Sequence, residues 1–175
     1  MGQDESLPPI AGDGLRHWTV GGAIIDDDSG LLLVRNRRRN GRSDWSPPGG
    51  VIDPGETIVG GLTREVHEET GLRVSDWRGP IYRIEVLAPD MGFHLAVEAH
   101  LAVAWSGQIQ IDDPDGIVEE GRFVGTDETT LLLDTGPPWV AEPLLSWVGE
   151  RWSGCRQFNF HVEGRDPSTR VIHRL

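Results

Sequence analysis

Apolar residues gather in short runs near the start of the chain, and turn-forming residues separate them. Residues 18–25 and 31–34 predict two strands, and the polar segment 26–30 between them predicts a turn. Residues 36–49 are rich in Arg, Asn, Gly and Pro, which predicts a loop. The chain is therefore expected to begin with a β-hairpin that a loop follows.

Helical spacing of apolar residues first occurs in the middle of the chain, at residues 57–70. Beyond it the pattern predicts strands at 81–88, 93–105 and 122–124, and helices at 127–133 and 139–152. Strands mixed with helices predict a single α+β domain in which helices pack on a sheet.

The two ends of the chain have patterns of their own. Residues 1–16 are polar, rich in Pro and Gly and without periodicity, which predicts a flexible N-terminal arm before a domain at 17–153. Apolar residues alternate with polar ones at 158–162, and residues 170–175 are placed to pair with them. We therefore expect a C-terminal extension at 154–175 that forms a β-hairpin packed on or beside the domain.

Composition narrows the classes of protein and partner. The 175 residues include 28 acidic and 16 basic ones, a formal charge of −12 with 37% hydrophobic residues. Such a chain is too apolar for a disordered protein, and its length suits one domain. Its acidity disfavours nucleic-acid polymers and anionic membranes as partners. Cys155 is the single cysteine, which excludes an intramolecular disulfide. We expect a cytoplasmic protein, either a monomer or a homodimer.

Three acids of the central helix point to chemistry. Glu65, Glu68 and Glu69 have the spacing i, i+3, i+4, so their side chains are neighbours on a helix. The apolar stripe of this helix contains Ile58, Leu62 and Val66. At about 100° per residue, Glu65 and Glu69 fall beside that stripe. A solvated helix face is the simple alternative, but it would place both acids opposite the stripe. Carboxylates turned toward the protein need a proton, a cationic partner or a metal ion, and three oxygen donors suit Mg²⁺ or Mn²⁺.

The helix and the turn before it carry a motif. The segment from Gly50 to Leu72 reads GVIDPGETIVGGLTREVHEETGL. With Gly50, Glu56 and residues 64–72, it resembles the Nudix box at every fixed position. This resemblance to the Nudix hydrolases, of the MutT-like kind, is specific over these residues and looser over 17–152. It implies a Nudix fold, a mixed β-sheet sandwiched between α-helices in an α/β/α arrangement.

The resemblance also implies roles for the residues of the motif. Glu65, Glu68 and Glu69 would bind Mg²⁺, with Mn²⁺ as a substitute, and the main-chain carbonyl of Gly49 would be a further ligand. Glu65 or Glu68 would also act in catalysis through an activated water. Four residues would be structural: Gly50, Glu56, Arg64 and Gly71. The implied reaction is attack of water on a diphosphate linkage of a nucleoside diphosphate joined to another group, and cations that neutralise phosphate suit this reaction.

A general base would help to deprotonate the attacking water. Glu119 and Glu120, just before the late strand at 122–124, lie where Nudix proteins often supply such an acid. Asp113 and Asp115 compete for the role. The alternative for each of these residues is a solvated loop acid.

Positive charge is concentrated in one short segment. Residues 35–42 contain five Arg, just before the glycines of the motif. Arg grips phosphate with two parallel hydrogen bonds, so Arg35 and Arg37 are candidates to bind the substrate phosphates. A solvated loop is the alternative. Trp45 and Phe123 are candidates to stack on a base, with burial in the core as the alternative.

The motif identifies a reaction but not a substrate. By default the chain resembles a MutT-like (d)NTP pyrophosphohydrolase, and an ADP-ribose or nucleotide-sugar pyrophosphatase is the alternative. In either case the partner is a small nucleotide. A nucleotide-binding or regulatory Nudix module without catalysis is a third hypothesis, although the chain keeps the glutamates that such modules usually lose.

Overall fold

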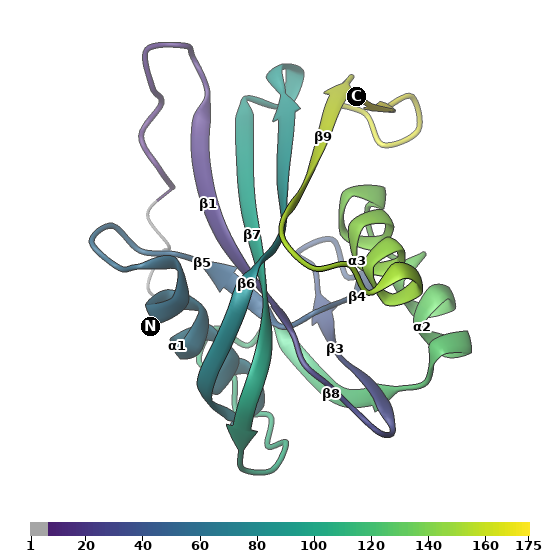
Figure 1. Ribbon diagram of the computed structural model, residues 1–175. Helices are drawn as coiled ribbons and strands as arrows, with labels where there is room; N and C mark the ends of the chain where they lie inside the picture. Colours follow the sequence, from purple (N-terminus) through teal and green to yellow (C-terminus); the bar gives the residue numbers. More distant parts are fainter. Residues whose placement is uncertain (1–6) are drawn as a thin grey trace.

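The computed structural model describes residues 7–175, so part of the predicted N-terminal arm, residues 1–6, lies outside the described chain. Two β-sheets occupy the centre of the molecule (Figure 1). The larger sheet has six strands in the order β10 (Val171–Arg174), β9 (Arg156–Glu163), β6 (Arg73–Ala88), β7 (Phe93–Ser106), β1 (Arg16–Ile24) and β5 (Gly49–Val51). It is mixed, because β1–β7 and β6–β9 are parallel pairs and the remaining pairs are antiparallel.

The smaller sheet has four strands: β2 (Asp26–Asp27), β3 (Gly30–Arg37), β4 (Ser43–Ser46) and β8 (Val118–Val124). β3 is its central strand and pairs antiparallel with the other three. The predicted hairpin of residues 18–25 with 31–34 is therefore wrong in its pairing: β1 pairs with β5 and β7 of the larger sheet, and only the short β2 pairs with β3 across the predicted turn.

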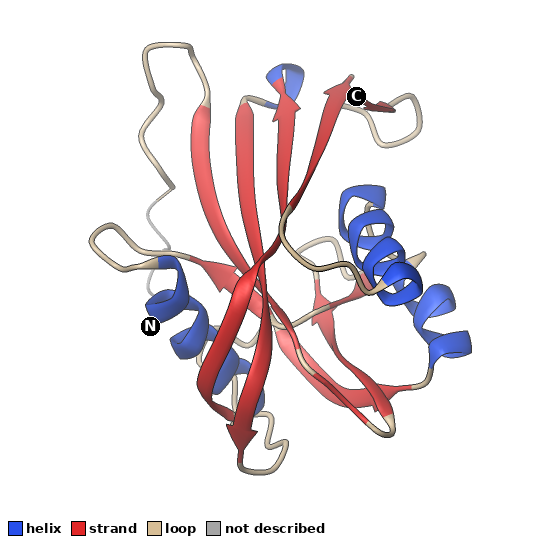
Figure 2. Ribbon diagram, in the orientation of Figure 1, coloured by secondary structure: helices blue, strands red, loops and turns tan. Residues whose placement is uncertain are grey.

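The α-helices are α1 (Ile58–Thr70), α2 (Thr126–Leu133) and α3 (Pro138–Glu150), and Pro89–Met91 form a short 3₁₀ turn, η1. α1 lies on one side of the sheets, and α2 and α3 lie on the other (Figure 2). α1 packs on β1, β5 and β6, whereas α3 packs on β6 and β9. The predicted α+β architecture, with mixed strands between helices, is confirmed.

Two groups of buried side chains hold these layers together. Under α1, Leu62 and Val66 are fully buried against Leu32 and neighbouring residues of the sheets. On the opposite side, Trp147 of α3 and Phe160 of β9 belong to the larger core. Full burial of one such aliphatic side chain contributes about 1.5–3 kcal/mol. The core residues of α1 therefore fix the face that this helix turns to the sheet.

The prediction of a loop over residues 36–49 holds only at residues 38–42 and 47–48 and is wrong for the rest. β3 continues to Arg37, β4 occupies Ser43–Ser46, and β5 begins at Gly49. Both β4 and β5 are short and lie beside longer strands, which supply their backbone partners. Backbone pairing of this kind does not require alternating apolar and polar side chains, so a segment rich in Gly, Pro and Arg can form a strand that the sequence pattern does not predict.

β6 also begins earlier than the pattern predicts, at Arg73 instead of residue 81. The added half is polar, and its pairing with β7 is irregular between Val74 and Tyr82. Such irregularities interrupt the period of two on which the prediction of a strand rests.

The last strands join the main sheet. β9 lies beside β6, and its residues Phe158, Phe160 and Val162 face the core. β10 pairs antiparallel with β9 and forms the edge of the sheet. Within residues 7–175, every helix is too short or too polar to span a membrane.

Candidate active site

α1 begins and ends where its sequence signals indicate. Thr57 precedes the first turn, and its Oγ1 accepts a hydrogen bond from Gly60 N at 3.0 Å. Gly71 ends the helix at φ 77°, a left-handed conformation that favours glycine. Gly61 lies where the helix approaches the turn before it, because a Cβ there would be 2.7 Å from Glu56 Oε2. These contacts fix both the ends of α1 and its rotation.

Glu65 lies against the backbone of β5. Its side chain is 14% exposed, and a Cβ on Gly50 would lie 2.5 Å from its carboxyl carbon. Glycine at position 50 is therefore required for the carboxylate to reach this place. Burial raises the pKa of Glu65, and the hydrogen bond from Arg64 opposes that rise.

Glu69 is more deeply enclosed than Glu65. Its Oε2 accepts a hydrogen bond from Gly49 N at 2.9 Å. Burial raises the pKa of Glu69 to about 8, the bond from Gly49 opposes the rise, and the negative charges of Glu65 and Asp113 add to it. A carboxylate in such surroundings takes up either a proton or a cation.

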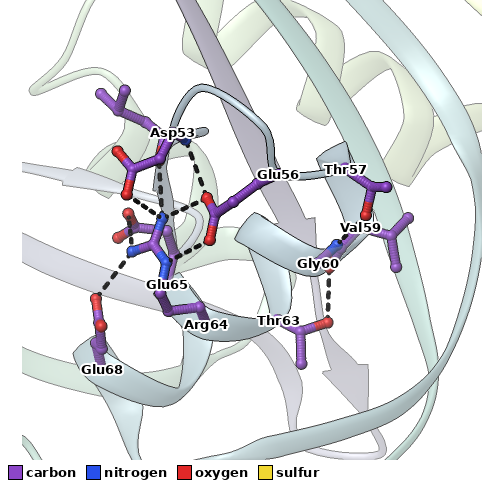
Figure 3. Close-up of polar contacts among 10 residues, drawn as sticks. Asp53, Glu56, Thr57, Val59, Gly60, Thr63, Arg64, Glu65 and Glu68 are labelled. Carbon is purple, nitrogen blue, oxygen red and sulfur yellow. Dashed lines mark hydrogen bonds and ion pairs between the residues drawn. The ribbon is translucent and has the colours of Figure 1, made fainter.

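Arg64 holds the turn before α1 against the helix (Figure 3). Its Nε and Nη2 donate to the two carboxylate oxygens of Glu56, each at 2.9 Å, and Nη2 also donates to Val51 O at 3.2 Å. Its Nη1 donates to Glu65 Oε1 at 2.7 Å and to Glu68 Oε2 at 3.1 Å. These bonds lower the pKa of Glu56 to about 2 and raise that of Arg64. Arg64 thus links the acids of the motif in one network.

The donor set suits a hard divalent cation, although the described residues contain no group of three His, Cys, Asp or Glu side chains arranged to enclose one. Arg64 occupies one oxygen of Glu65 and one of Glu68, so a cation would share or displace those bonds. Glu69 supplies the buried, electron-rich group that fits such an ion. The carbonyl of Gly49 also fits as a ligand. Pro48 O and Ile52 N form hydrogen bonds with β1. Because the backbone groups of a strand point alternately to its two sides, those of Gly49 point away from β1.

The loop between β7 and β8 brings two further acids to α1. Gln110 N donates to Thr70 O at 2.8 Å, which ties this loop to the end of the helix. Asp113 accepts hydrogen bonds from three backbone N–H groups of its own loop, those of Asp115, Ile117 and Val118. The negative charge of Asp115 raises the pKa of Glu65. Within residues 7–175, the Asp115 carboxylate makes no hydrogen bond, so it is the less constrained of the two acids.

Glu119 and Glu120 lie within β8, not before a strand, because β8 begins at Val118. Their carboxylates pair with the predicted phosphate-binding arginines. Arg35 lies 3.5 Å from Glu119 and 3.3 Å from Glu120, and Arg37 lies 3.4 Å from Glu119. The structure therefore brings these four predicted site residues together in ion pairs, and Arg122 adds a further contact of 3.2 Å to Glu120.

The aromatic candidates belong to the packed interior. Trp45 is 8% exposed in the larger core. Phe123 stacks on Trp105 with ring centroids 5.6 Å apart. Burial of Trp45 thus leaves it unavailable for stacking on a nucleotide base, whereas Phe123 is partly buried against the core under α1.

Sequence reasoning missed a buried polar residue on the strand before the motif. Asn36 is 6% exposed, and its Nδ2 donates to Ser46 Oγ at 2.8 Å and to Asp44 Oδ1 at 3.2 Å. The available signal was its alternation with Arg35 and Arg37 along β3. The prediction of a loop over this segment concealed that signal.

Comparison with known proteins agrees with this geometry. The NUDIX domain profile matches residues 15–148. A MutT-like protein of Streptomyces ambofaciens is 33% identical over 148 residues, which cover 79% of this chain and 87% of the relative. Phosphatase NudJ of Escherichia coli (O1:K1 / APEC) is 28% identical over 146 residues, covering 78% and 86%. The solution structure of the E. coli ORF135 protein matches with a TM-score of 0.64 at 18% identity, covering 81% of this chain and 97% of that one. The chain belongs to the NUDIX domain family and is a Nudix hydrolase.

Proposed function

We propose that this protein hydrolyses a diphosphate linkage in a small nucleotide, with (d)NTPs as the first substrate class, and that it requires Mg²⁺ or Mn²⁺. One observation carries the proposal. The carboxyl groups of Glu65 and Glu69 are buried beside the backbone of Gly49 and Gly50, where each must either be protonated or have its negative charge balanced by a cation.

The residues of the motif would have separate roles in binding the metal ion and in positioning its ligands. Glu65, Glu68 and Glu69 would bind the divalent ion, with the carbonyl of Gly49 as a further ligand. When bound, such an ion neutralises phosphate oxygens and lowers the pKa of water. Arg64 would position Glu65 and Glu68 from one side, as its bonds of 2.7 and 3.1 Å support.

For the general base, the contacts favour Asp115 over Glu119 and Glu120. Each of the two glutamates pairs with Arg35, so acting as a base would require it to leave that ion pair. Asp115 lies near enough to Glu65 to influence its pKa, and the described residues leave its carboxylate without a hydrogen bond. Catalytic roles for Glu119 and Glu120 remain as alternative proposals, and the variants Asp115→Asn, Glu119→Gln and Glu120→Gln distinguish the three candidates.

Arg35 and Arg37 would bind the substrate phosphates in place of the glutamates with which they now pair. Their side chains are 39% and 65% exposed, and their contacts with Glu119 and Glu120 are 3.3–3.5 Å long. Pairs this exposed contribute little stability, so an incoming phosphate can replace a glutamate at small cost. The paired acids then remain near the substrate.

Relatives guide the choice of substrate class. The MutT-like relative covers most of this chain, which favours a (d)NTP, whereas an ADP-ribose or nucleotide-sugar substrate is the alternative. A module that binds nucleotides without catalysis is the proposal of a different class. Retention of Glu56, Glu65, Glu68 and Glu69 argues against such a module.

The test is a substrate panel with Mg²⁺ and, separately, Mn²⁺. It includes (d)NTPs, ADP-ribose and nucleotide sugars, and it is read by ³¹P NMR in ¹⁸O-labelled water. We expect turnover of at least one member, with ¹⁸O in one product phosphate, which identifies the phosphorus attacked. Tight binding without turnover across the panel would support the non-catalytic module and contradict hydrolysis.

A further inference from the structure

Four of the six histidines of the chain form one row across the larger sheet. His17 of β1 pairs with His94 of β7, and Leu87 of β6 pairs with His94 on one side and with His161 of β9 on the other. His161 in turn pairs with His173 of β10. Paired residues project from the same face of a sheet, so these side chains share a face at the end where β1, β7, β6 and β9 run side by side (Figure 1).

At one end of the row, two imidazoles face each other between two carboxylates. His17 Nδ1 lies 3.1 Å from His94 Nδ1, and the ring centroids are 5.1 Å apart. On the outer side of the pair, His17 Nε2 lies 2.9 Å from Asp13 Oδ2, and His94 Nε2 lies 2.5 Å from Glu85 Oε2. The order is thus carboxylate, imidazole, imidazole, carboxylate.

These four groups do not have enough protons for a hydrogen bond at each of their three contacts. An ionised carboxylate only accepts hydrogen bonds, so His17 Nε2 must carry the proton of its bond to Asp13. His94 Nε2 must also carry a proton, because an unprotonated nitrogen would repel the Glu85 oxygen 2.5 Å away. A neutral imidazole has one N–H, which leaves a lone pair and no proton on each of the two Nδ1 atoms, 3.1 Å apart. A positive species between the two nitrogens removes the repulsion between these lone pairs.

We propose that His17 and His94 bind one divalent transition-metal ion, of the Zn²⁺, Ni²⁺ or Cu²⁺ class, through their Nδ1 atoms. Imidazole nitrogen suits these metals, and bonds of about 2.0–2.1 Å to two nitrogens 3.1 Å apart subtend about 98°. That angle lies between the square-planar and tetrahedral values. Waters would complete the coordination, since His17 is 45% exposed.

Asp13 and Glu85 would act as orienting groups for this site. Histidines that bind metals donate their other ring N–H to a carboxylate, which fixes the tautomer and makes the ligating nitrogen more basic. His17 has such a hydrogen-bonded partner in Asp13. His94 Nε2 lies at ion-pair distance from Glu85 Oε2, a buried oxygen to which no other group of residues 7–175 donates a hydrogen bond.

The site differs in chemistry from the acids of α1 and lies away from them, although His17 lines one cavity with Asp53 and Glu56 of the turn before α1. Along β1, His17 lies four residues before Gly21, where an added Cβ would be 3.1 Å from Leu62 Cβ of α1; at about 3.3 Å per residue this is about 13 Å. The motif offers oxygen donors, which suit Mg²⁺, whereas the histidine pair offers nitrogen. The histidine pair joins β1 to β7, so a metal ion would cross-link two strands of the larger sheet.

The test uses the full chain, labelled with ¹⁵N, in excess Mg²⁺ near pH 8. ZnCl₂ is added while long-range ¹H–¹⁵N spectra of the histidine rings are recorded. We expect the first equivalent of Zn²⁺ to shift Nδ1 of His17 and His94 together, with both Nε2 atoms still protonated. If these resonances do not respond, or if only other histidines respond, a shared proton fills the gap and the proposal is overturned.

Variants supply the matched comparison. His17→Gln and His94→Gln should each abolish the Zn²⁺-dependent rise in Tm, whereas His173→Gln, at the other end of the same row, should retain it. Glu85→Gln should weaken Zn²⁺ binding roughly 10–100-fold, as expected for an orienting carboxylate. Equal Zn²⁺ affinity in His17→Gln and His173→Gln would contradict the proposal. Because His17 is half-exposed, its variant tests the site without disturbing the core, and its Mg²⁺-dependent hydrolysis should be unchanged.

Discussion

Substitution of Gly50 by Ala tests the packing of Glu65 directly. The added Cβ would lie 2.5 Å from the Glu65 carboxyl carbon, whereas ordinary contact begins near 3.4 Å, so the carboxylate must move by about 0.9 Å. Arg64 Nη1, 2.7 Å from Glu65 Oε1, restricts the directions available to it. A catalytic group misplaced by about 1 Å can lose about 10²-fold in rate. We therefore expect kcat to fall about 10²-fold, equivalent to about 2.7 kcal/mol.

Gly22→Ala is the matched control, because Gly22 pairs with Gly49 in the same two strands. A Cβ at Gly22 would lie 3.9 Å from its nearest neighbours, which is ordinary contact. Both variants are assayed for Mg²⁺-dependent product release with the best substrate of the panel, and their thermal unfolding is measured alongside. If Gly50→Ala and Gly22→Ala have the same kcat, Glu65 does not need its observed position and the reasoning fails.

Three further predictions concern stability. Glu56→Gln should lower the free energy of unfolding near pH 7; because the pKa of Glu56 is lowered to about 2, the wild-type advantage should be complete above the usual carboxyl pKa of 4.5 and disappear as the pH falls toward 2. Urea unfolding of both proteins across this range checks the sign, and a constant difference at all pH values would refute it. Leu62→Ala should cost about 2–5 kcal/mol, because Leu62 is fully buried under α1, and a cost below 1 kcal/mol would contradict the packing described. Phe160→Ala should cost about 3–5 kcal/mol by the same measurement if β9 belongs to the main core, whereas Tm would barely change if β9 were a loose extension.

The central helix was predictable because several independent signals coincide there. Thr57 and Gly71 mark its ends, and Leu62 and Val66 mark its buried face. Each is a local property of the sequence, and the structure confirms each of them. The position of Glu65 and Glu69 beside the buried stripe followed from helical geometry alone.

Strand pairing was less predictable because it depends on partners distant in sequence. β5 is a strand because β1 lies beside it, and nothing in the three residues Gly49–Val51 predicts that partner. The early half of β6 is polar and irregular, so its strand character also comes from its neighbour β7. Pairing between distant residues likewise explains why the contacts of Glu119 with Arg35 and Arg37 could not be predicted from the sequence.

The side-chain rows of a sheet are a further property that only the assembled fold reveals. His17, His94, His161 and His173 are spread over most of the chain, and no spacing along the sequence relates them. Strand order and register bring them into one line. The spacing of His17 and His94 along the sequence therefore does not indicate that they form a pair.

The most direct test of the central claim compares the wild type with Glu69→Gln on the best substrate of the panel, with and without Mg²⁺. Glutamine has the shape of Glu69 and can still accept the hydrogen bond from Gly49 N, but it has no negative charge to hold a cation. Glu142→Gln, the same change on the exposed side of α3, is the control. The account predicts Mg²⁺-dependent hydrolysis in the wild type and the control, and a loss of at least about 10²-fold in Glu69→Gln with Tm preserved. Equal turnover in the three proteins would contradict it, as would hydrolysis by the wild type that persists undiminished without divalent cations.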